Sequence, residues 1–118
     1  MSAQPPGERN TPLLLLARAL IASPTDSAAA RRFIEHATFA APGELVPTLE
    51  TSIAEDFLGL PPWARNLLFR LACLQSPEDA NLRRRAASDL RAFGPDWDGE
   101  ADRLDAEADR IEQRAASS

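Results

Sequence analysis

The chain contains no lysine, no tyrosine, one histidine and one cysteine among its 118 residues. Acid–base and nucleophilic catalysis rely largely on these side chains, so the sequence offers few candidate catalytic groups. The single Cys73 excludes an intramolecular disulfide framework. His36 lacks the neighbouring ligands of a metal site, and the five glycines are isolated, unlike those of a phosphate-binding loop. We therefore expect no catalytic residue, no metal and no cofactor, with His36 as a packed or surface side chain and Cys73 as a small buried one.

Residues that favour β-strands are also scarce, since valine occurs only at Val46 and isoleucine at four positions. Alanine, leucine, arginine and glutamate are abundant, and all of them favour helices. The sequence therefore predicts an all-α protein, a compact bundle of about six helices. Residues 1–10 have no apolar periodicity and are expected to form a disordered leader before a single helical domain over residues 11–118.

Capping residues and apolar spacing predict helices at about 12–22, 26–40, 62–74, 78–93 and 96–114. A further helix is expected to begin at Pro47, after a turn at Pro42 and Gly43, because an interior proline disrupts a helix. Gly59 is expected to end that helix in a left-handed conformation. Ile34 and Phe57 are expected on buried faces, as is the stripe Ala101, Leu104, Ala108, Ile111 and Ala115.

The chain repeats part of its sequence after 53 positions. Each copy contains an apolar helix, a Ser-Pro-x-Asp turn and a second helix that carries arginines, which indicates two helical-hairpin repeats, at about 11–60 and 61–118. The recurring residues are Leu14, Leu15, Ala19, Ser23, Pro24, Asp26, Arg31, Arg32 and Pro42, which return as Leu67, Leu68, Ala72, Ser76, Pro77, Asp79, Arg84, Arg85 and Pro95.

The second copy resembles a HEAT-type repeat over residues 64–94. Its second helix has the pattern aliphatic-Arg-x-x-Ala-Ala-x-x-Leu, which runs here from Leu82 and Arg83 to Leu90, after Leu67, Leu68 and Leu71 on the first helix. The first copy departs from the pattern, because large and small residues are exchanged at Ala29, Ala30, Phe33, Ile34 and Ala37. The resemblance implies an α-α superhelix that serves as a scaffold or binding surface, without a substrate or cofactor.

Charge is unevenly distributed. The whole chain has a net charge of −5, and all 13 basic residues are arginines, a bias that indicates a GC-rich bacterial genome. Residues 98–112 are strongly acidic, whereas the helix expected at about 78–93 carries arginines. Asp79 and Arg83 are spaced there as an i,i+4 ion pair. Candidate partner-binding residues are an aromatic side chain at a helix start and charged residues on these two helices: Trp97, Asp102, Asp105, Asp109, Arg84 and Arg91.

These features favour a non-enzymatic protein–protein interaction module: an adaptor, a regulatory subunit, or an immunity or antitoxin-like neutraliser. An acidic nucleic-acid mimic or nucleic-acid-associated regulator is the alternative, and an enzyme with an unrecognised site is the third. Another protein is the expected partner, rather than nucleic acid. The apolar segment 13–22 is interrupted by Arg18 and is too short to span a membrane, so we expect a cytoplasmic protein without membrane association; no oligomeric state is predicted.

Overall fold

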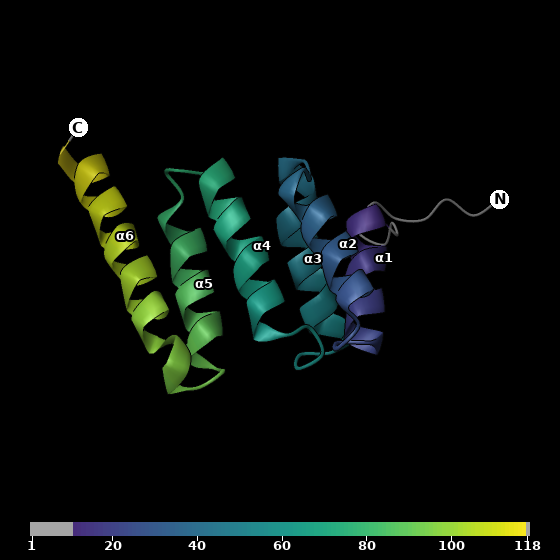
Figure 1. Cartoon of the computed structure of the whole chain (residues 1–118). Helices are drawn as coiled ribbons and strands as arrows, with labels where there is room; N and C mark the ends of the chain where they lie inside the picture. The colour runs from purple at the N-terminus through teal and green to yellow at the C-terminus, as the bar shows by residue number, and fades with distance from the viewer. Residues whose placement is uncertain (1–10, 118) are drawn as a thin grey trace. The chain divides into compact units, whose positions relative to one another are not determined.

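The computed structural model describes residues 11–117, and within that range it has six α-helices, one short 3-10 turn and no strand (Figure 1). The prediction of an all-α protein is confirmed. The expected leader at residues 1–10 lies outside the described residues. Internal contacts divide the chain into two compact units, with the boundary between Leu68 and Phe69, inside the fourth helix. We call residues 11–68 unit 1 and residues 69–117 unit 2.

Unit 1 contains α1 (Pro12–Ala22), α2 (Ser27–Thr38), α3 (Pro42–Glu55) and the first part of α4 (Pro62–Gln75), and α1 packs against both α2 and α3 (Figure 1). The Thr11 hydroxyl accepts a hydrogen bond from the Leu14 N–H at 3.3 Å, and the Asp26 carboxylate accepts one from the Ala28 N–H at 2.9 Å. These caps satisfy amide groups that the first helical turn leaves without partners. They confirm the predicted starts of α1 and α2.

The core of unit 1 is built from leucines and one aromatic pair. Phe33 is fully buried, and its ring forms a T-shaped pair with that of Trp63, at a centroid distance of 6.0 Å and an interplanar angle of 85°. The expectation that Ile34 and Phe57 are buried is wrong, because they are 41% and 51% exposed. The buried side chains of this core include Leu13, Leu14, Leu20, Phe33, Leu45, Leu49, Leu60 and Leu68.

The predicted start of α3 at Pro47 is wrong, because α3 begins at Pro42 and Pro47 lies inside it. Pro42 occupies the first helical position, where a missing N–H costs nothing. Pro47 removes one hydrogen bond to the Gly43 carbonyl, but both residues lie on the exposed side of α3, where water can solvate that oxygen. Burial of Leu45 and Leu49 on the other side stabilises the helix in spite of the proline.

Gly59 does not have the predicted left-handed conformation, since Gly94, with φ 104°, is the positive-φ residue among those described. The need for glycine at position 59 is instead steric. A Cβ atom there would lie 2.6 Å from the Asp56 carboxylate oxygen Oδ2 and 2.8 Å from Ile21 Cγ2. The α3–α4 loop therefore passes too close to α1 for a side chain.

Unit 2 contains the rest of α4, α5 (Ala80–Arg91), the 3-10 turn η2 (Pro95–Trp97) and α6 (Asp98–Ser117). α5 and α6 pack side by side as a helical hairpin, joined through the left-handed Gly94 (Figure 1). The predicted α6 stripe is confirmed at four positions, whereas Ala115 is exposed. The buried side chains of the two helices are short or aliphatic: Leu82, Ala86, Ala87 and Leu90 on α5, and Ala101, Leu104, Ala108 and Ile111 on α6.

Candidate functional site

The charged residues proposed as partner contacts lie opposite one another on the α5–α6 hairpin. Arg84 contacts Asp109 at 2.8 Å and Asp105 at 3.7 Å, while Arg91 contacts Asp102 at 2.9 Å and Asp105 at 2.7 Å. The Asp105 carboxylate therefore bridges both arginines. Together with Glu112, which also pairs with Arg84, these residues form what we call the charge ladder.

The charge ladder holds its arginines in the charged state. Hydrogen bonds from Arg84 to Asp109 and Glu112 raise the pKa of Arg84, and hydrogen bonds to Asp102 and Asp105 raise that of Arg91. The pairs are partly exposed, so solvent screens each one and its contribution to stability is small. Five of the six predicted partner-binding residues thus pair with one another within unit 2. The four carboxylates of the charge ladder outnumber its two arginines, so this surface keeps a net negative charge.

Trp97, the sixth candidate, lies apart from the charge ladder. It is the last residue of the turn η2, and its backbone N–H donates to the Gly94 carbonyl at 3.2 Å. Its side chain is half-buried beside the start of α6. Trp97 is therefore available to solvent only in part.

Arg83 is the buried arginine of unit 2, with 8% of its surface exposed. Its guanidinium donates to the backbone carbonyls of Cys73, Ser76 and Asp79 at 3.0–3.1 Å and to the Glu107 carboxylate at 3.3 Å. The predicted side-chain pair between Asp79 and Arg83 is not formed, because the Asp79 carboxylate caps α5 by accepting the Leu82 N–H. Arg83 instead places positive charge at the C-terminal end of α4, where the helix dipole favours it.

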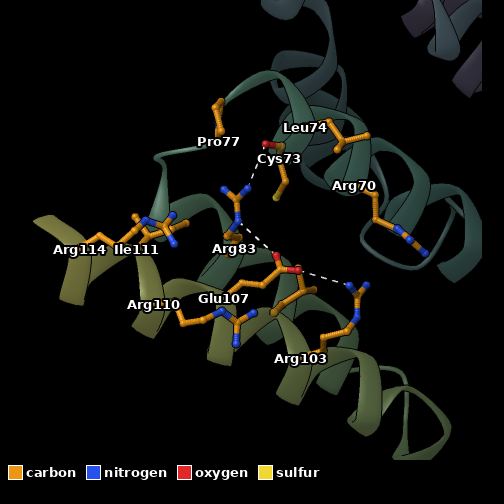
Figure 2. Close-up of a pocket in the computed structure, with 11 residues that line it drawn as sticks. Arg70, Cys73, Leu74, Pro77, Arg83, Arg103, Glu107, Arg110, Ile111 and Arg114 are labelled. Atoms are coloured by element: carbon orange, nitrogen blue, oxygen red, sulfur yellow. Dashed lines mark hydrogen bonds and ion pairs between the residues drawn. The ribbon is translucent and has the colours of Figure 1, made fainter.

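A cleft of about 350 Å³ lies above Arg83, between the C-terminal part of α4 and α6 (Figure 2). Five arginines and one glutamate line it, together with a small apolar floor. We call it the arginine cleft. Its lining residues are Arg70, Cys73, Leu74 and Pro77 from α4 and the following turn, Arg83 from α5, and Arg103, Leu104, Glu107, Arg110, Ile111 and Arg114 from α6.

The single acidic residue in the arginine cleft is already paired. Glu107 accepts hydrogen bonds from Arg83 and Arg103, as the dashed lines in Figure 2 show. Cys73 is buried at its edge, and burial raises the pKa of the thiol above its ordinary value, so the thiolate nucleophile is disfavoured.

Unit 1 carries a shallow depression of about 370 Å³ on the surface of α1 and α2. Phe39, directly after α2, lies at its edge and is 88% exposed. Leu16, Arg32, Glu35 and His36 complete the lining. His36 Nε2 lies 3.6 Å from Glu44 Oε1 on α3, a neighbour that sequence spacing does not indicate.

No protein-family model, curated protein or solved structure matches this chain. None of the helices within residues 11–117 is long and apolar enough to cross a membrane. The same residues contain no group of histidine, cysteine and acidic side chains arranged to hold a metal ion.

Neither the arginine cleft nor the depression beside Phe39 is evident from the sequence. Arg110 and Arg114 lie within the helix expected at about 96–114, and their i,i+4 spacing places them on one face, away from the charge ladder. Phe39 directly follows a helix, and no large apolar side chain stands three or four residues before it. This lack of an apolar neighbour is a weak signal that the aromatic side chain is exposed.

Proposed function

We propose that this chain is a non-enzymatic protein-binding module, an adaptor, regulatory subunit or neutraliser built from HEAT-like helical hairpins. The observation that carries the proposal is the side chain of Phe39, 88% exposed at the edge of the depression on α1 and α2. The free energy of the system falls when a partner covers a solvated phenylalanine, and aromatic side chains are common anchors in interfaces.

The surroundings of Phe39 fit a protein interface. The half-buried Leu16 adds apolar surface to the depression, whereas Arg32, Glu35 and His36 provide donors and acceptors around it. An apolar centre with a polar rim is the usual organisation of a protein–protein interface.

The alternative of an acidic nucleic-acid mimic has less support. Such a mimic presents carboxylates that are free to contact a basic protein. In unit 2, Asp102, Asp105 and Asp109 are instead paired with arginines of the same hairpin.

Site-specific photocrosslinking tests the proposal. A benzophenone amino acid at position 39 should capture a protein from an extract of the source organism, and mass spectrometry would identify it. The same photocrosslinker at Leu58, which is 74% exposed elsewhere in unit 1, serves as the matched control.

The captured protein is then purified and titrated by calorimetry against the full chain. Phe39→Ala should weaken binding by about thirtyfold, the effect of losing an interface anchor worth roughly 2 kcal/mol. Leu58→Ala should leave the affinity unchanged. Equal affinity of the wild type and Phe39→Ala would overturn the proposal.

A further inference from the structure

We propose that the arginine cleft of unit 2 binds an acidic segment of a partner protein, with an aliphatic side chain on its floor and carboxylates on its rim. This site is separate from the depression beside Phe39, and the inference does not depend on the function proposed above. It rests on the charge of the cleft, on the lack of internal acceptors for Arg110 and Arg114, and on the length of the cleft.

The rim has positive charge that the chain itself does not balance. Within residues 11–117, neither Arg110 nor Arg114 forms a hydrogen bond or an ion pair, and both side chains are exposed. Arg70 has only a long contact, 3.9 Å, with Glu100. Carboxylates of a ligand would accept charge-assisted hydrogen bonds from these guanidinium groups.

The floor of the arginine cleft is apolar. Leu104 and Ile111 are largely buried, whereas Leu74 at the edge is 77% exposed. A bare inorganic anion would leave this apolar surface uncovered. A ligand that carries an aliphatic side chain between its acidic groups would cover it and gain the free energy of burial.

The length of the arginine cleft favours a peptide over a small anion. Along α6 the cleft runs from Arg103, which is paired with Glu100 and Glu107, to Arg114, a distance of about 16 Å at a rise of about 1.5 Å per residue. That length corresponds to roughly five residues of an extended peptide. A single phosphate group reaches only one or two of these arginines.

Nucleic acid is a poorer match than an acidic peptide. Glu107 lies in the cleft, and Asp109 and Glu112 lie on the neighbouring face of α6. A continuous phosphate backbone would meet these carboxylates, whereas a peptide can place its acidic residues only opposite the arginines.

Fluorescence anisotropy with a short labelled peptide of alternating glutamate and leucine tests this inference on the full chain. Peptides in which glutamine replaces glutamate, or serine replaces leucine, should each bind at least about tenfold more weakly, since both the charges and the apolar anchor contribute. Binding of the glutamate–leucine peptide should also weaken as salt is added.

The variant Arg110→Gln with Arg114→Gln should weaken peptide binding by about tenfold or more. Its matched control, Arg31→Gln with Arg85→Gln, removes the same charge from exposed positions that line neither the arginine cleft nor the depression beside Phe39, and should bind as the wild type does. Leu74→Ser should also weaken peptide binding. Because Leu74 is exposed, this substitution should leave the fold intact, so that weaker binding reports the loss of the apolar contact. Circular dichroism verifies that all three variants are folded.

Three results would overturn the inference. The first is equal loss of affinity in the Arg110 and Arg31 double variants, which would indicate nonspecific charge attraction. The second is displacement of the peptide by millimolar inorganic phosphate alone, which would indicate a free-anion site. The third is tighter binding of a single-stranded oligonucleotide than of the peptide at the same salt concentration.

Discussion

Replacement of Arg83 by methionine should destabilise unit 2 by about 2–4 kcal/mol. The buried guanidinium donates four hydrogen bonds, three to carbonyls and one to Glu107, and methionine keeps the apolar stem but none of the donors. A hydrogen bond to a charged group contributes roughly 1.5–3 kcal/mol to stability, but the combined contribution of the four bonds is not lost in full. The carbonyls of Cys73 and Ser76 keep backbone donors, at 3.1 Å each, and therefore do not become buried groups without a partner.

The two tryptophans allow the effect to be assigned to one unit, because Trp63 lies in unit 1 and Trp97 in unit 2. In a Trp63→Phe background, Trp97 fluorescence during urea unfolding should report the change in unit 2. Arg85→Met, at an exposed position of the same helix, should change the free energy of unfolding by less than about 0.5 kcal/mol.

Arg83→Lys separates charge from geometry. Lysine retains the positive charge at the end of α4 but cannot reach four acceptors in one plane, so its stability should fall between those of the wild type and Arg83→Met. The reasoning is refuted if Arg83→Met and Arg85→Met unfold at the same urea concentration.

Two further predictions concern the α3–α4 loop and the charge ladder. Gly59→Ala should destabilise unit 1 by about 1–3 kcal/mol, because the added Cβ would overlap Ile21. Gly43→Ala, with open space around position 43, should stabilise α3 by roughly 0.5 kcal/mol. Thermal unfolding of both variants measures the difference, and equal melting temperatures would contradict the prediction. Replacement of the ladder aspartates by arginine should lower the melting temperature more at low salt than at high salt, since like charges would then face Arg84 and Arg91. A change in melting temperature that is independent of salt would show that these pairs do not act through charge. The aspartates changed are Asp102, Asp105 and Asp109.

Local signals in the sequence were sufficient to predict the helices that begin with a capping side chain. Thr11 and Asp26 mark their helices because a side-chain oxygen accepts an amide hydrogen bond. The start of α3 has no such signal, since its N-cap is Ala41, which makes no side-chain hydrogen bond. The tertiary burial of Leu45 and Leu49, which sequence rules do not include, extends this helix across Pro47.

The candidate site depended even more on tertiary packing. The sequence indicated which arginines and aspartates are unusual, but not that Arg84 and Asp109 would neutralise each other across a hairpin. A buried arginine such as Arg83 is equally hidden in the sequence, because its acceptors are backbone carbonyls, which every residue has. Charge composition therefore indicated which residues carry the charge, but not the ion pairs that they form with one another.

The α5–α6 hairpin also bears on how the chain folds. The ion pairs of the charge ladder join residues no more than 28 positions apart, and those between Arg91 and Asp102 only 11 apart. Closing such short loops loses little chain entropy, and topologies dominated by local contacts fold on the order of microseconds to milliseconds. Hairpin formation in unit 2 is thus a local event, which does not depend on contacts between residues distant in the sequence.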